Sequence, residues 1–100
     1  MRAIFVAVAA VAATISFQAD ARDAQELYNK ACIACHASGA AGAPIAGNAE
    51  AWAPRVAKGM DALLHNVNNG VGAMPPKGMC MDCTDEEFKS LIEFMSAAKK

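Results

Sequence analysis

Neither sign of charge predominates in this sequence, which has nine basic and ten acidic side chains and a formal net charge of −1 at pH 7. That balance argues against nucleic acid or a strongly anionic membrane as a partner. The sequence contains no internal repeats, and no stretch alternates polar and apolar residues as a strand does. It also has no nucleophile constellation and no paired carboxylates with supporting context, so we do not expect an enzyme.

The N-terminal apolar stretch is too short to span a bilayer comfortably, since a spanning helix takes about 20 apolar residues. It follows Met1-Arg2, runs from Ala3 to Phe17 and precedes the small-x-small sequence Ala19-Asp20-Ala21. This order is typical of an export signal. We expect cleavage after Ala21, a periplasmic location without a membrane anchor and one mature domain over residues 22–100. Retention of the segment as an anchor is the alternative.

The most informative motif is Cys32-Ile-Ala-Cys35-His36. In a helical turn Cys32 and Cys35 are neighbours, so their thiols can reach the two vinyl groups on one edge of a haem. His36 can then coordinate the iron. A redox dithiol and half of a zinc site are the alternatives for a bare C-x-x-C. A domain this small buries little core by itself, which also favours a bound cofactor.

Three amphipathic stretches predict three helices. The first covers about residues 23–35 with Asp23 as its N-cap, the second covers residues 60–69 and ends at Gly70, and the third begins with a capping box at Thr84. The expected buried face of the first helix consists of Ala24, Tyr28, Ala31, Cys32 and Cys35. The fold class that these patterns predict is all-α.

The segments between these helices are richer in glycine and proline. Residues 38–47 and 70–83 should form loops. Residues 48–58 should contain one or two short helical turns, with Asn48 as a cap and Pro54 at a first helical position.

A second iron ligand should come from far along the chain, and methionine is a frequent choice. Met74 precedes Pro75-Pro76, which stiffen the backbone. A thioether in such a segment has little conformational entropy to lose when it is held over the iron. We therefore predict Met74 as the ligand. The alternatives are Met79, Met81, His65 and an open position, whereas Met60 and Met95 lie on apolar helix faces, where core packing is the default.

A second C-x-x-C pair, Cys80 and Cys83, is followed by Thr84 rather than histidine, so a second haem is not expected. The pair lies much further from Cys32 and Cys35 than the roughly 12–20 residues of compact zinc modules. In an oxidising compartment such a pair tends to close as a disulfide. A structural clamp and a redox-active disulfide are the two interpretations.

Together these segments resemble the cytochrome c5 family of class I c-type cytochromes, and the resemblance runs from about residue 23 to 95. It rests on Cys32-Ile-Ala-Cys-His36, Pro44, Ala51-Trp-Ala-Pro-Arg55, Ala73-Met-Pro-Pro-Lys-Gly78 and Cys80-Met-Asp-Cys83. The resemblance implies a compact class I cytochrome c fold, in which three main helices and short helical turns surround one covalent haem c.

The resemblance also implies the roles of the site residues. Cys32 and Cys35 would form thioethers, His36 and Met74 would be the axial ligands of the haem iron, Cys80 and Cys83 would form a disulfide, and the Pro44 carbonyl would accept a hydrogen bond from His36. Trp52 and Arg55 are candidate haem contacts, with core packing and a surface charge as their respective alternatives.

The expected function is a soluble periplasmic electron carrier that shuttles one electron at a time between respiratory donors and terminal acceptors. Its partners would be transient redox proteins, with Lys58 and Lys77 as candidates for steering, and the protein would be a monomer or a weak homodimer. The first alternative is a haem-based ligand sensor or the haem subunit of a redox enzyme, with a labile Met74. The second is a zinc or dithiol protein without haem.

The motif at residues 32–36 predicts one covalent haem per chain when the protein is made together with haem-attachment machinery. A pyridine haemochrome assay should show it. A preparation without haem would contradict the interpretation and favour the zinc or dithiol alternative.

Overall fold

The computed structural model describes residues 21–98, which fold into helices joined by short connections. The N-terminal helix consists of three consecutive segments, which are α1 (Ala24–Leu27), the π-helical η1 (Tyr28–Cys32) and α2 (Ile33–His36). The short 3-10 turn η2 (Ala40–Gly42) is followed by α3 (Ala49–Val56), α4 (Met60–Asn69), the 3-10 turn η3 (Pro76–Met79) and α5 (Asp85–Ser96). Residues 1–20 of the expected export signal lie outside the described residues.

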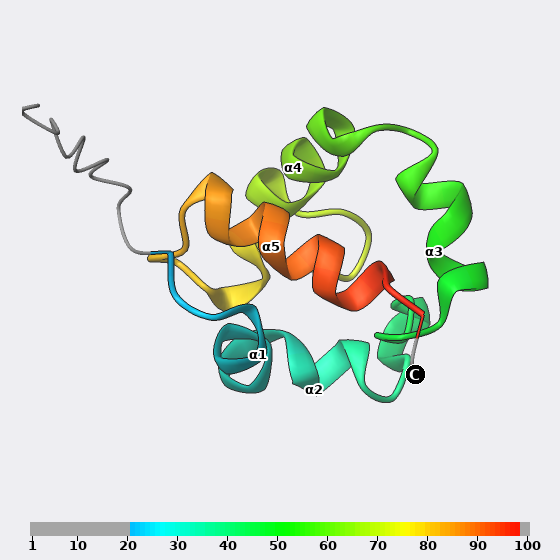
Figure 1. Ribbon diagram of the computed structural model, residues 1–100, viewed down its shortest axis with the longest axis horizontal. Coiled ribbons are helices and arrows are strands. Elements are labelled where there is room, and N and C mark those ends of the chain that lie inside the picture. Colours follow the sequence, from blue (N-terminus) through cyan, green and yellow to red (C-terminus); the bar gives the residue numbers. More distant parts are fainter. Residues whose placement is uncertain (1–20, 99–100) are drawn as a thin grey trace, which may run out of the picture.

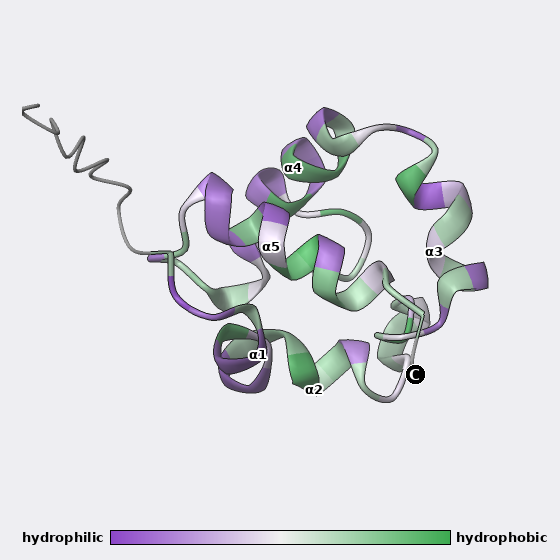
Figure 2. Ribbon diagram, viewed as in Figure 1, coloured by the Kyte–Doolittle hydropathy of each residue, from purple (hydrophilic) through white to green (hydrophobic). Residues whose placement is uncertain are grey.

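Helix α5 lies in the middle of the molecule, with the other helices around it (Figure 1). It packs against α1, α3 and α4. In Figure 2 its ribbon carries both green apolar turns and purple polar turns, as expected for a helix with one face in the core and one in solvent. Between residues 21 and 98 no helix is long and apolar enough to cross a membrane.

The core forms where the N-terminal helix meets α5. Leu27 and Leu91 are the most deeply buried large side chains, and Phe88 is buried beside them. The Tyr28 and Phe94 rings join the two helices, with their centroids 5.4 Å apart. The all-α fold expected from the sequence is thereby confirmed, with the first and last helices packed together.

Several local expectations are confirmed. Helix α4 covers Met60–Asn69 and ends at Gly70. The Thr84 hydroxyl accepts from the Glu87 backbone N–H while the Glu87 carboxylate accepts from the Thr84 N–H, which completes the capping box. The Asn48 side chain accepts from the Ala51 N–H at the start of α3.

Asp23 occupies the N-cap position of α1 as expected, although its side chain makes no capping hydrogen bond. Two other local expectations are wrong. Pro54 lies inside α3 instead of beginning a helix, because the Asn48 cap starts the helix earlier. The buried face of the N-terminal helix includes Leu27, which is 1% exposed, whereas Cys35 is exposed. Leu27 lies three residues after Ala24 and four before Ala31, so regular helical spacing places it on the same face.

Arg22 ties the start of the described chain to the beginning of α5. Its Nε donates to Glu87 Oε2 over 2.8 Å, and its backbone N–H donates to the same oxygen over 3.0 Å. Its Nη1 reaches Asp82 Oδ2 over 3.0 Å. The Arg22 guanidinium, together with the backbone N–H groups of Thr84 and Arg22, lowers the pKa of Glu87 from 4.5 to about 2. Glu87 is buried and its carboxylate is fully partnered, so the charged form stabilises the fold.

This pKa makes the stability of the protein depend on acidity. Because the folded-state pKa of Glu87 lies below the ordinary value, the stabilisation is complete above about pH 4.5 and disappears as the pH falls toward 2. Glu87→Gln retains an oxygen that can cap Thr84 but removes the charge. It should lower the free energy of unfolding at pH 7 and flatten its decline between pH 4.5 and 2, measured by urea unfolding.

The matched control is Glu93→Gln, which removes an exposed carboxylate from the same helix. It should unfold at the same urea concentration as the wild type at pH 7. Equal loss of stability in the two variants would contradict a special role for the Glu87 charge.

Candidate haem-binding site

The end of the N-terminal helix places the three motif residues at one side of the molecule. Cys32 ends η1, and Cys35 and His36 belong to α2. The His36 side chain is buried, and its Nδ1 lies 2.8 Å from the Pro44 carbonyl oxygen. Because that carbonyl can only accept, Nδ1 carries the proton and Nε2 keeps its lone pair. Nε2 is therefore the ring atom that can bind a metal.

A cavity of about 320 Å³ lies against this motif. It is lined mainly by apolar and small residues, and its walls include Cys32, Cys35, His36 and Met74. A second cavity, of about 260 Å³, shares His36 and Met74 with the first and continues toward Trp52 and Ile92. We refer to the two cavities together as the crevice. The structure thus brings the motif and the predicted methionine to one apolar crevice.

The loop that carries Met74 is fixed by its own backbone. The Val71 N–H donates to the Met74 carbonyl over 3.1 Å, and the Met74 N–H donates to the Val71 carbonyl over 2.9 Å. Gly70 precedes this turn with φ 85° and ψ 154°, a conformation that is essentially restricted to glycine. A Cβ on Gly70 would lie 2.8 Å from the Met74 carbonyl oxygen, and one on Gly78 would lie 3.0 Å from the Met74 methyl carbon.

The other candidate ligands are placed less favourably. Met79 lines the first cavity, but its side chain is 72% exposed, and Met81 is 68% exposed. His65 is exposed on α4, where its carbonyl accepts from the Asn69 side chain. Met95 is 4% exposed and belongs to the core, although it also lines the second cavity. The geometry therefore favours Met74 among these candidates.

Trp52 and Arg55 both line the crevice from α3. The Trp52 ring is buried, stacks on the His36 imidazole with centroids 5.7 Å apart, and donates from Nε1 to the Ile45 carbonyl over 3.0 Å. The Arg55 guanidinium donates from Nη1 to the Ala51 carbonyl over 2.7 Å and lines both cavities. Trp52 thus packs in the core and positions the histidine, and Arg55 presents a positive charge at the crevice.

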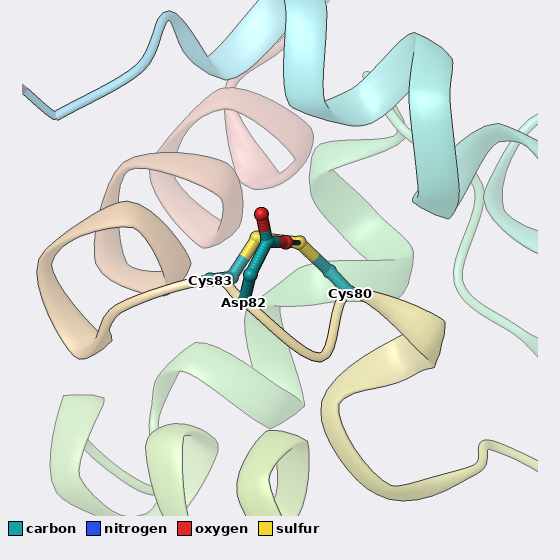
Figure 3. Close-up of side chains that lie close together, drawn as sticks. All are labelled: Cys80, Asp82 and Cys83. Atoms are coloured by element: carbon teal, nitrogen blue, oxygen red, sulfur yellow. Dashed lines mark hydrogen bonds between the residues drawn. A yellow bond between two sulfur atoms is a disulfide. The ribbon is translucent and has the colours of Figure 1, made fainter.

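Cys80 and Cys83 are joined by a disulfide in the turn before α5 (Figure 3). Both residues are buried, and the exposed Asp82 lies between them in the sequence. The Asp82 carboxylate and the two sulfurs lie close enough together to hold a metal ion by distance alone, but disulfide sulfurs are not the thiolates that zinc requires. The pair does not share a site with Cys32 and Cys35, so the structure gives no support to a four-cysteine zinc centre.

The remaining cysteines do not resemble a reactive dithiol. Burial raises the pKa of the Cys32 thiol, whereas redox-active C-x-x-C pairs depend on a lowered thiol pKa. Cys35 is exposed at the mouth of the crevice. Around one apolar crevice the structure places a metal-binding nitrogen, a thioether sulfur and two thiols. A covalently attached haem needs two such donors, two such thiols and an apolar lining, so the residues present fit this group.

The sequence did not reveal two residues that shape the site around Met74. Val71 lines both cavities and pairs with Met74, and Gly78 leaves room for the Met74 methyl group. A glycine shortly after Pro75-Pro76 was a signal for a left-handed turn, but nothing in the sequence showed which side chain that turn approaches.

A helical fold around an apolar crevice, with a C-x-x-C-H turn on one wall and a methionine loop on the other, defines a class I c-type cytochrome. Comparison with known proteins agrees. A family model described as "Cytochrome C oxidase, cbb3-type, subunit III" matches residues 19–95. Cytochrome c5 from Ectopseudomonas mendocina is 44% identical over 78 residues, which cover 76% of this chain and 90% of that protein.

Two solved structures are similar as well. A mono-haem ferrocytochrome c from Shewanella putrefaciens has 57% identity and a TM-score of 0.69, covering 80% of this chain and 99% of its own. The cytochrome c in an electron transfer complex with nitrite reductase has 43% identity and a TM-score of 0.67, covering 74% and 90%. The chain belongs to the cytochrome c5 family, which confirms the resemblance noted in the sequence. Like its relatives it is a single-haem electron carrier and not an enzyme.

The glycine before the methionine turn provides a test of this geometry. Gly70→Ala would place a methyl group against the Met74 carbonyl oxygen. Gly59→Ala is the matched control, because Gly59 has nearly the same backbone conformation (φ 93°, ψ 155°) but a Cβ there would meet no atom within 4 Å. The control should lose about 1–3 kcal/mol from backbone strain alone. Gly70→Ala should lose about 1–3 kcal/mol more, as overpacked sites do. Urea unfolding measures both, and equal losses would contradict the packing argument.

Proposed function

We propose that this chain is a periplasmic one-electron carrier in which His36 and Met74 are the axial ligands and Cys32 and Cys35 form the thioethers. The observation that carries this proposal is that His36 and Met74, which are far apart in the sequence, line the same crevice. When bound, the haem supplies an iron that alternates between the ferrous and ferric states.

The protein residues would hold the haem and set its environment. Pro44 fixes the His36 ring through Nδ1 and thereby raises the basicity of Nε2. Met74 presents a thioether, and methionine ligation favours the ferrous state and raises the reduction potential. The apolar lining of the crevice excludes water, which also influences the potential. Two protein ligands would leave no open position for a substrate, as suits a carrier.

The mouth of the first cavity is the surface through which we propose electron exchange. Cys35 is exposed there, and the apolar side chains of Val71 and Met79 are 51% and 72% exposed. Such a small apolar patch fits brief contacts with redox partners rather than a permanent interface. A cytochrome c with 43% identity has been solved in an electron transfer complex with nitrite reductase. By analogy, we propose a respiratory donor and a terminal reductase or oxidase as partners.

The export of the protein is part of the same proposal. Covalent haem attachment through C-x-x-C-H and a disulfide between Cys80 and Cys83 both suit an oxidising compartment outside the cytoplasm. The small-x-small sequence ending at Ala21 precedes Arg22, whose contacts with Glu87 begin the described fold. We therefore propose cleavage after Ala21 and a mature domain that begins at Arg22.

Ligation by Met74 is tested by removing its thioether. Met74→Ala should lose the methionine–iron charge-transfer band in the red absorption of the oxidised protein, and its reduced form should bind carbon monoxide rapidly. The wild type should show the band and bind carbon monoxide slowly or not at all. Absorption spectra and flash photolysis measure these properties.

Met79→Ala is the matched control, because Met79 lines the same cavity from a more exposed position. It should keep the band. If Met79→Ala loses the band and Met74→Ala keeps it, the assignment of the ligand is wrong. Rapid carbon monoxide binding by the wild type would instead favour a ligand sensor with a labile methionine.

A further inference from the structure

We propose that Lys77 is a positioning residue, whose side chain holds the turn that keeps Met74 at the crevice. The proposal rests on the function proposed above, in which Met74 binds the iron. It assigns to Lys77 a task inside the protein, whereas the sequence suggested a role for this lysine in steering redox partners.

The turn after the methionine has a backbone that needs support. Lys77, Gly78 and Met79 all have positive φ values, of 60°, 55° and 68°. Two of these three residues carry a Cβ, and left-handed conformations at such residues are costly. Strained segments of this kind persist only when the surrounding structure determines them. Contacts with other parts of the molecule must therefore hold this turn in place.

The Lys77 side chain makes contacts with two helices. Its Nζ donates to Asn68 Oδ1 on α4 over 3.3 Å. The same ammonium lies 5.6 Å from the centre of the Phe88 ring on α5, within the range of a cation–π interaction. Asn68 Nδ2 in turn donates to Asp85 Oδ1 over 3.0 Å. Lys77 therefore joins η3 to the end of α4 and the beginning of α5.

The turn that Lys77 holds is in contact with Met74. Gly78 follows Lys77 directly, and a Cβ built on it would lie 3.0 Å from the Met74 methyl carbon. The Gly78 N–H donates to the Pro75 carbonyl over 3.0 Å, and the Cys80 N–H donates to the Lys77 carbonyl over 2.9 Å. A shift of Lys77 would move Gly78 and remove the wall behind the methionine methyl. The contacts of the Lys77 ammonium therefore affect the position of Met74 through a single intervening residue, Gly78.

The experiment compares Lys77→Met with the wild type in the oxidised holoprotein. Methionine retains the length and the apolar stem of lysine but removes the ammonium. The bond between Met74 and iron should weaken, so added imidazole should replace the methionine with an affinity about fivefold higher, the size expected for loss of one hydrogen bond. The charge-transfer band should also disappear at a lower temperature. Lys77→Arg should restore both properties, since Arg keeps a charge that can contact Asn68 and Phe88.

Two controls separate positioning from general effects. Lys89→Met removes a lysine ammonium from α5, where Lys89 pairs with Glu86 instead of the methionine loop, and it should bind imidazole as the wild type does. Thr84→Ala breaks the capping box and thereby lowers stability; it should shift urea unfolding to a lower concentration without a matching rise in imidazole affinity.

Asn68→Ala provides an independent variant that removes the hydrogen-bond partner of the ammonium on α4, together with the hydrogen bond from Asn68 to Asp85. It should raise the affinity for imidazole. The double variant Lys77→Met/Asn68→Ala should raise this affinity by less than the product of the two single increases. If both single variants bind imidazole with the same affinity as the wild type, the proposed role of Lys77 is wrong. Absence of the charge-transfer band from the wild type would overturn Met74 ligation itself and this inference with it, so the two failures are distinguishable.

Discussion

The hydrogen bond between His36 Nδ1 and the Pro44 carbonyl is the interaction on which the site depends, because it decides which imidazole nitrogen can bind iron. The surrounding contacts all constrain the same residue. Trp52 stacks on the ring, and the His36 carbonyl accepts from the Ala46 N–H over 2.8 Å. Gly47 then donates to the Met95 carbonyl over 2.8 Å, which ties this loop to α5. The histidine is thus fixed by a helix end, a loop and the core.

The opposite wall of the crevice is built in another way. Met74 lies in a loop, and its position follows from a two-hydrogen-bond turn with Val71, from the prolines that follow, and from a left-handed segment that begins at Lys77. Residues 70–79 of this loop are all exposed or half-buried. Loops with few buried contacts open more readily than packed helices. The two proposed ligands therefore differ in how firmly the protein holds them, and we expect any change in iron coordination to begin on the methionine side.

Local sequence patterns predicted most of the helices because their signals act over a few residues. The Thr84 capping box, the Asn48 cap and the apolar spacing over residues 60–69 all formed as expected. The failures concern single residues. Pro54 is tolerated inside α3 because an earlier cap sets the start of the helix. Leu27 is buried on the same regular stripe as Ala24 and Ala31, whereas Cys35, which the stripe also includes, is exposed at the crevice. Helical spacing predicts which residues share a face but not what that face meets in the tertiary structure.

The sequence alone determined the chemistry of this protein. The spacing of Cys32, Cys35 and His36 indicated the haem, and Met74-Pro75-Pro76 indicated a stiff loop with a thioether, because covalent reach and backbone restriction depend on neighbours in the chain. Only the tertiary structure brought Met74 and His36 to one crevice, paired Arg22 with Glu87, and placed the Lys77 ammonium against Asn68 and Phe88. These contacts join residues that are distant in sequence, and they form only when helices pack against one another.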